Sequence, residues 1–341
     1  MKRLPAFAIV LFLSSCAHRE AAGVSSAPRV VSLPLPGANG QPVRMDYLAY
    51  DGAKDRVWVP AGNTGRVDVI DAKSGELHAI EGFPTAERQR EGKTIVVGPS
   101  SVSIGDGLAY VGNRADFAVC EVSTDTLTKG ACAKLSGMPD GVVYVAATHE
   151  VWVTTPSEHA LVVLDASSKG ALTVKATVTV EGEPEGYAVD DAGGILYTNL
   201  EDKDRTLSID VRAKKVSHDW PAGCGEDGPR GLAIDPSREI LFVACPTRIA
   251  SHDLKRDDAE ISSLDAGAGV DNLDFSPTLH ELFAAGGKSA TLTVAKVDET
   301  GHLTLDRTVP TSQGARNAVV SKDGDAFVAN TPGGSVLRVT R

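Results

Sequence analysis

The chain reads Glu185-Gly-Tyr-Ala-Val-Asp190 and, after a short turn, Leu196-Tyr-Thr-Asn199. Alternating apolar residues bounded by Gly, Asp and Asn are typical of two short β-strands joined by a turn. This pair of segments recurs seven times, and every second segment carries an aromatic residue, although aromatic residues make up only 5% of the chain. That regularity identifies an internal repeat. The first segments begin at residues 46, 100, 140, 185, 230, 271 and 316, and the aromatic residues are Trp58, Tyr110, Trp152, Tyr197, Phe242, Phe283 and Phe327.

The length of the repeat predicts the fold. Successive copies begin 40 to 54 residues apart, and several continue with a third strand, as in 65–75, and a fourth, as in 172–180. Four strands in about 40–45 residues is the period of a propeller blade. The sequence therefore predicts an all-β protein over residues 30–341, a seven-bladed β-propeller of four-stranded antiparallel blades.

The two ends of this region predict how the ring closes. The seventh copy stops at a third strand, 335–341, and has no fourth. An orphan strand, 29–35, precedes the first copy, so we expect it to complete the last blade and cover its exposed edge. The first blade also contains a charged insertion, 86–93, which we interpret as a surface loop or, alternatively, a lip over one face.

Three second strands carry a family resemblance. They read Ala109-Tyr-Val-Gly-Asn113, Leu196-Tyr-Thr-Asn199 and Ala326-Phe-Val-Ala-Asn330. Together with the strand VDVIDAKSGEL at 67–77, they resemble the YVTN-repeat propellers, the YncE-like family of exported bacterial proteins. The resemblance covers about residues 30–341. It implies the propeller fold and says little about function, because the motifs shared are largely packing and turn residues.

The first sixteen residues have the pattern of an export signal. Lys2 and Arg3 precede a short apolar run, 6–13, which is too short to span a membrane as a helix. Leu13-Ser-Ser-Cys16 resembles the lipobox of bacterial lipoproteins, which implies cleavage after residue 15 and lipidation of Cys16. Ala17 is not the Asp associated with inner-membrane retention, so the resemblance implies an outer-membrane anchor facing the periplasm or the exterior. Residues 16–29 then form a flexible tether. The alternative is an ordinary cleaved signal with a chance cysteine.

The remaining cysteines suit an oxidising compartment. Cys120 and Cys132 lie at equal distances from Thr126, the centre of a predicted hairpin turn, so they face each other at a spacing that a disulfide can bridge. Cys224 and Cys245 flank a second strand pair, less symmetrically. We predict two local disulfides, with buried free thiols as the alternative. The chain has no C-x-x-C motif that would indicate a redox or zinc site.

The repeat also predicts where a ligand would bind. Propellers bind ligands near the central channel, where the innermost strands begin, and the repeat places one residue of each blade there. These candidate rim residues are Asp46, Ser100, Asp140, Glu185, Arg230, Asp271 and Arg316. The acids and arginines can neutralise one another as a rim network. Alternatively, the two arginines can bind a carboxylate or phosphate ligand.

A calcium site is a third interpretation of this rim. Calcium prefers carboxylate oxygens that converge from different segments, and Asp46, Asp140, Glu185 and Asp271 offer four. A similar placement of acids occurs in the calcium-dependent lactonases of the gluconolactonase group, which have six blades. On this interpretation the protein is a metal-dependent hydrolase of lactones or small esters.

Little else in the chain indicates catalysis. The sequence has no G-x-S-x-G nucleophile elbow, and its 8 histidines are dispersed without metal-binding spacing. The formal charge of −11 argues against nucleic acid as a partner. We therefore predict a binding or scaffold module with an unidentified protein or small-molecule partner, and keep the calcium-dependent hydrolase as the alternative.

Overall fold

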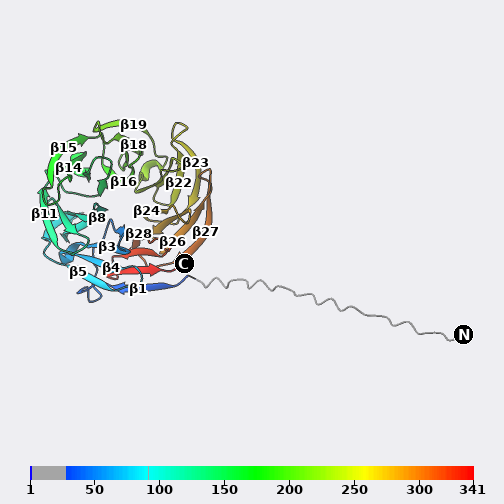
Figure 1. Ribbon diagram of the computed structural model, residues 1–341, viewed down its shortest axis with the longest axis horizontal. Coiled ribbons are helices and arrows are strands. Elements are labelled where there is room, and N and C mark those ends of the chain that lie inside the picture. Colours follow the sequence, from blue (N-terminus) through cyan, green and yellow to red (C-terminus); the bar gives the residue numbers. More distant parts are fainter. Residues whose placement is uncertain (2–27, 91) are drawn as a thin grey trace.

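The computed structural model describes Met1 and residues 28–90 and 92–341, and places seven four-stranded antiparallel sheets in a ring (Figure 1). This confirms the predicted seven-bladed β-propeller. Residues 2–27, which contain the predicted signal segment after Met1, Cys16 and all but the last two residues of the predicted tether, lie outside the described residues. No helix of the described residues is long and apolar enough to cross a membrane.

In blades one to six the four strands follow one another in the chain, from the innermost to the outermost, whereas the outermost strand of blade seven is β1. Blade one contains β2 (Ala49–Asp51), β3 (Arg56–Ala61), β4 (Arg66–Asp71) and β5 (Leu77–Ile80). Blade two contains β8 (Pro99–Gly105), β9 (Leu108–Asn113), β10 (Ala118–Ser123) and β11 (Lys129–Lys134). Blade three contains β12 (Val142–Val145), β13 (Glu150–Thr155), β14 (Ala160–Asp165) and β15 (Thr173–Thr179). Blade four contains β16 (Pro184–Asp190), β17 (Ile195–Leu200), β18 (Arg205–Asp210) and β19 (Lys215–Pro221).

The remaining blades follow the same plan. Blade five contains β20 (Leu232–Asp235), β21 (Ile240–Ala244), β22 (Arg248–Asp253) and β23 (Ala259–Asp265). Blade six contains β24 (Val270–Ser276), β25 (Glu281–Gly286), β26 (Thr291–Val297) and β27 (Leu303–Pro310). Blade seven contains β28 (Ala315–Val320), β29 (Ala326–Asn330), β30 (Ser335–Val339) and β1 (Val30–Pro34). Three short 3-10 turns are η1 (Gly62–Thr64), η2 (Pro156–Glu158) and η3 (Gly225–Asp227).

The strand β1 closes the ring as predicted. It pairs antiparallel with β30, with Val30 opposite Val339 and Pro34 opposite Ser335. Figure 1 shows β1 along the outside of the last blade, next to the C-terminus. Leu33 packs against a core cluster that spans blades seven and one. The two ends of the propeller are therefore held in one sheet.

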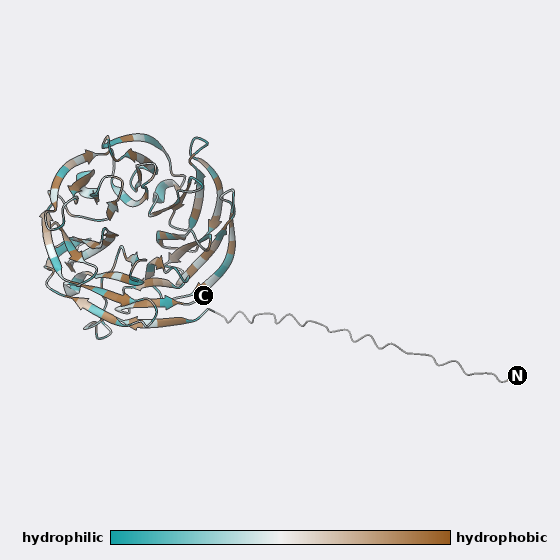
Figure 2. Cartoon of the chain, in the orientation of Figure 1, coloured by the Kyte–Doolittle hydropathy of each residue, from teal (hydrophilic) through white to brown (hydrophobic). Residues whose placement is uncertain are grey.

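The repeated aromatic residues form the core between blades. Trp58, Tyr110, Phe242 and Phe327 are completely buried, and the other three repeat aromatics are at most 8% exposed. Trp58 of blade one, for example, packs with Val102 and Val111 of blade two. Figure 2 shows hydrophobic residues alternating with hydrophilic ones along the strands. One face of each strand therefore packs against the next blade, which explains the aromatic period in the sequence.

Both predicted disulfides are present. Cys120 on β10 is bonded to Cys132, its cross-strand partner on β11. Cys224, beside η3, is bonded to Cys245, directly after β21. Each disulfide is local in sequence, joining residues 12 and 21 positions apart.

The charged insertion forms a β-hairpin and not an irregular loop. Its strands are β6 (Ala86–Arg90) and β7 (Lys93–Val97), which pair antiparallel between blades one and two. Arg88, Gln89 and Arg90 of this hairpin line a cavity at the end of the central channel. This placement favours the lip interpretation of the insertion over the surface-loop interpretation.

Candidate functional site

The predicted rim lies at one end of the central channel, in a cavity of about 670 Å³. Five of the seven predicted residues line this cavity: Asp46, Ser100, Asp140, Glu185 and Arg316. Asp46 and Asp140 come just before the innermost strands β2 and β12, whereas Ser100, Glu185 and Arg316 lie near the beginning of β8, β16 and β28. We call this cavity, at the end where the innermost strands begin, the channel mouth.

Arg114 connects two of the predicted acids. Its guanidinium group lies 2.8 Å from the Asp46 carboxylate and also forms an ion pair with Asp140. The Arg114 backbone N–H donates to the carbonyl of Gly98 at 2.9 Å, which fixes the start of this side chain. Burial alone would lower the pKa of Arg114, but Asp140 and Asp46 outweigh it and raise this pKa above its ordinary value. Arg114 therefore carries a permanent positive charge at the channel mouth.

Sequence reasoning missed Arg114, although a signal for it exists. The residue comes directly after β9, the second strand of blade two. Because β9 runs antiparallel to β8, its last residues lie at the same end of the blade as the first residues of β8. Residues that follow second strands therefore reach the channel mouth as well, and our prediction considered only residues that begin innermost strands.

Tyr47 and Glu185 form a hydrogen-bonded layer across the channel. The Tyr47 hydroxyl donates to the Glu185 carboxylate at 2.8 Å, lies 3.4 Å from Asp140, and accepts from the N–H of Gly186 at 3.2 Å. Burial, together with Asp140, Asp271 and Asp46, raises the pKa of Glu185 well above its ordinary value. This layer connects blade one to blades three and four, on the opposite side of the channel.

The other predicted residues have different partners. Arg316 forms an ion pair with Asp271 at 3.2 Å, and Asp271 does not line the channel mouth. Arg230 forms an ion pair with Glu201, which follows β17, and lies outside the cavity. Ser100 is 4% exposed, and its hydroxyl has no hydrogen-bond partner in the described part of the chain. Only Arg316 and Asp271 therefore form an ion pair within the predicted set, whereas Asp46 and Asp140 share Arg114, so the described rim residues do not form one ring.

The arrangement does not fit a calcium ion. Guanidinium groups already occupy the space beside three of the four proposed ligands, since Arg114 contacts Asp46 and Asp140 while Arg316 contacts Asp271. Among the described residues there is no group of three or more His, Cys, Asp or Glu positioned to hold a metal ion. We therefore derive no reaction through a metal at this site.

Three further arginines line the channel mouth. Arg44 lies just before β2, and Arg88 and Arg90 lie on the hairpin strand β6. Arg44 is exposed and forms no ion pair within the described residues. The Arg88 guanidinium donates to the carbonyl of Ala115 at 2.8 Å and lies 5.5 Å above the ring of Phe117. Together with Arg114 and Arg316 they make five arginines, compared with three acids, among the described residues that line this cavity.

The fold and the site define a seven-bladed propeller with an arginine-rich cavity at one end of its channel. No protein-family model matches the chain, and no curated protein matches it by sequence. Solved structures match it by fold, each over at least 90% of this chain and at least 97% of the other. They include a chain of the mitotic checkpoint complex (TM-score 0.72, 18% identity), Kuenenia stuttgartiensis hydrazine synthase (0.72, 14%) and streptogramin B lyase (0.70, 11%). At such identities the likeness shows the propeller fold alone.

Proposed function

We propose that this protein is a cell-envelope binding protein whose channel mouth takes a small organic anion that carries a carboxylate or phosphate group. The observation that carries the proposal is the excess of arginine at the channel mouth, in a chain whose formal charge is −11. The planar guanidinium group donates paired hydrogen bonds that match carboxylate and phosphate oxygens. A local cationic cavity on an acidic protein also directs small anions to this one place.

The separate positions of the arginines and the acids in the cavity indicate which chemical groups the two ends of the ligand carry. Arg44 and Arg90 are exposed and Arg88 is half-buried, whereas Asp140 and Glu185 lie beside the buried Tyr47 layer, so we infer that the arginines lie at the outer part of the cavity and the acids at its inner part. A second anionic group would meet these acids, so the inner end of the ligand is neutral and carries hydrogen-bond donors such as hydroxyl groups. Apolar side chains complete the walls: Met45, Ile95, Val97, Pro99 and Met138. A hydroxylated monoanion, such as a sugar acid or a polyol phosphate, has this pattern.

Thermal unfolding in the presence of matched anions and neutral polyols tests the proposal. We expect gluconate and glycerol phosphate to raise the melting temperature, because a ligand that binds only the folded state stabilises it. Sorbitol and glycerol, which lack the charge, should raise it less. Combined Arg44→Gln, Arg88→Gln and Arg90→Gln substitutions are expected to weaken anion binding at least tenfold.

A matched control distinguishes the loss of arginines at the channel mouth from the loss of positive charge elsewhere on the surface. Combined Arg212→Gln, Lys215→Gln and Arg256→Gln substitutions remove the same charge from exposed positions on blades four and five. This variant should bind the anions as the wild type does. Equal loss of binding in both triple variants, or equal stabilisation by anions and neutral polyols, would contradict the proposed site.

We also propose that Cys16 is lipidated and anchors the protein in the envelope, and that the chain belongs with the YVTN-repeat propellers. The lipobox pattern before Cys16 and the two disulfides, which suit an oxidising compartment, support this location. Several acyl chains on one residue give stable membrane attachment.

Fractionation of bacterial cells tests the anchor. The wild type is expected in the membrane fraction, and Cys16→Ser is expected in the soluble fraction because it lacks the thiol that carries the lipid. A wild-type chain in the soluble fraction, or a Cys16→Ser variant that stays with the membrane, would refute the lipid anchor.

A further inference from the structure

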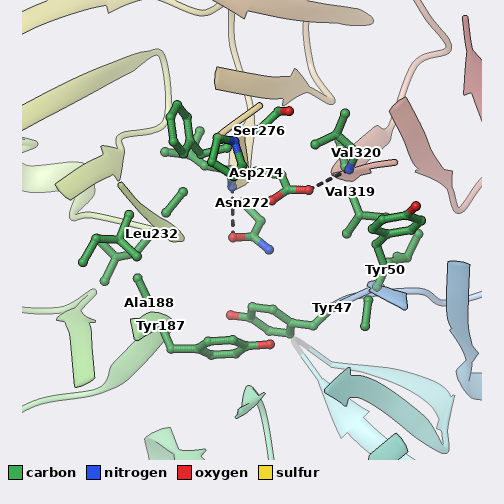
Figure 3. Close-up of a pocket in the computed structure, with 18 of the residues that line it drawn as sticks. Tyr47, Tyr50, Tyr187, Ala188, Leu232, Asn272, Asp274, Ser276, Val319 and Val320 are labelled. Atoms are coloured by element: carbon green, nitrogen blue, oxygen red, sulfur yellow. Dashed lines mark hydrogen bonds between the residues drawn. The ribbon is translucent and has the colours of Figure 1, made fainter. Parts of the chain in front are cut away.

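A second cavity, of about 530 Å³, lies on the other side of the Tyr47 layer. It is lined by the innermost strands of six blades, and we call it the inner chamber (Figure 3). Tyr47 lines the inner chamber but not the channel mouth, whereas Asp46 and Glu185 line the channel mouth but not the inner chamber. Thr278 and Lys322, in turns that follow innermost strands, also line it, so it extends to the end of the channel opposite the mouth.

Asp274 is a carboxylate in this chamber without a cationic partner. It lies on β24 and accepts a hydrogen bond from the backbone N–H of Val320 at 2.6 Å. Burial raises its pKa to about 7, and no cation forms an ion pair with it in the described residues. Among the residues that the structure describes, the one cation that lines the chamber is Lys322, which is already paired with Asp55 at 3.2 Å. Asp274 therefore differs from Asp271, three residues earlier, which has Arg316.

Two tyrosines form the wall that faces Asp274. The rings of Tyr47 and Tyr187 stack with their centres 5.6 Å apart and their planes at 26°. Figure 3 shows these rings on one side of the chamber, with Asn272 and Asp274 on the other. The remaining walls are largely apolar, from Val143, Ala188, Leu232, Ile234 and Val319. The chamber thus combines an aromatic surface and apolar walls with one carboxylate.

We infer that the inner chamber binds a small primary amine with an aromatic or similarly flat apolar body, whose ammonium group pairs with Asp274 while its ring packs on Tyr47 and Tyr187. A buried carboxylate without a partner is unfavourable, and a ligand cation supplies that partner. Aromatic faces attract both flat apolar groups and cations. This site is independent of the proposed anion site, because it lies beyond the Tyr47 layer and selects the opposite charge.

The pH dependence of binding follows from Asp274. Among the described residues, the only other charged group that lines the chamber is Lys322, which is already paired with Asp55. The tyrosines that line it are Tyr47, Tyr50 and Tyr187, and burial raises their pKa values above the ordinary range. In the absence of a ligand, the Asp274 carboxyl group is mostly protonated below about pH 7 and mostly ionised above it. Since only the ionised form attracts the ammonium group, affinity should rise about tenfold from about pH 6 to about pH 8.

Calorimetry on the full chain tests the inference with phenethylamine and its neutral counterpart, phenethyl alcohol. We expect the amine to bind at least tenfold more tightly than the alcohol at about pH 8. Asp274→Asn keeps an oxygen that accepts from the Val320 N–H, so we expect it to retain the fold. This variant is expected to lose at least tenfold in amine affinity, to bind the alcohol as before, and to lose the pH dependence.

A control at the channel mouth and a second measurement complete the test. Arg88→Gln should leave amine binding unchanged, because Arg88 lies in the other cavity. The pH dependence of the wild type is measured independently, in case Asp274→Asn does not fold. The inference is overturned if amine and alcohol bind equally, if neither binds at millimolar concentration, or if Asp274→Asn binds the amine like the wild type.

Discussion

Replacing Arg114 by Met is expected to lower the free energy of unfolding by about 3 kcal/mol, because it leaves two carboxylates facing each other without their shared cation. Arg114 contacts both Asp46 and Asp140, and its side chain is only 19% exposed. Glu185 lies close to the same acids, so the repulsion is not limited to one pair. Urea unfolding of the wild type and the variant measures the loss.

Two further variants identify the cause of that loss. Adding Asp140→Asn to Arg114→Met removes one of the repelling charges and should recover part of the stability. Arg205→Met removes an arginine from an exposed pair with Asp219 on the outer strands of blade four, and should cost less than about 1 kcal/mol. If Arg114→Met is as stable as the wild type, the network does not hold the channel mouth together.

Replacing Leu33 by Pro in β1 is expected to destabilise the protein by about 3 kcal/mol. Leu35 donates to the carbonyl of Gly334, and Arg29 accepts from the N–H of Thr340. Because hydrogen-bonded positions alternate along an antiparallel pair, the N–H of Leu33 also points to β30. Proline at this position removes that hydrogen bond as well as the apolar contact of Leu33 with the core between blades seven and one.

The neighbouring residue provides the control. Ser32 is exposed and lies in a non-hydrogen-bonded pair with β30, so its N–H points away from β30. Ser32→Pro is therefore expected to cost less than about 1 kcal/mol, since proline is tolerated at such edge positions. Equal destabilisation by both substitutions would mean that β1 is sensitive to proline in general, and equal tolerance would mean that closure by β1 contributes little to stability.

The fold was predictable because the same packing pattern, a large apolar residue on the second strand, recurs in all seven blades. Each blade must present an aromatic or large apolar residue to its neighbour, so Trp58, Trp152 and Phe242 recur at one place in the pattern. The closing strand was predictable by counting, since the last blade had three strands and one strand was left over. The facing positions of Cys120 and Cys132 follow from hairpin symmetry alone.

The partners of the rim residues were not predictable in the same way. Their positions follow from the repeat, but the pairing of Arg114 with Asp46 and Asp140 joins residues 68 and 26 positions apart. That pairing depends on the side-chain geometry of one arginine outside the repeated segment. Likewise, nothing in the charged insertion distinguishes a loop from a hairpin that bears Arg88 and Arg90 at the channel mouth.

Asp274 could not be identified as a site residue from the sequence either. It lies in the middle of an innermost strand, at a position where the other blades carry residues such as Ala188, Ala233 and Val319. The sequence marks it as unusual only after the strands are aligned by their pairing with the second strands. Its burial, and the fact that no described cation pairs with it, depend on the closed ring, which no local pattern describes.

Anion binding at the channel mouth can be seen in a crystal structure of the protein with glycerol phosphate or gluconate. We expect the anionic group within hydrogen-bond distance of at least two of four arginines, Arg44, Arg88, Arg90 and Arg316. The hydroxyl groups should point toward Asp140 and Glu185. An anion bound only elsewhere on the protein, or an empty channel mouth at saturating ligand, would contradict it.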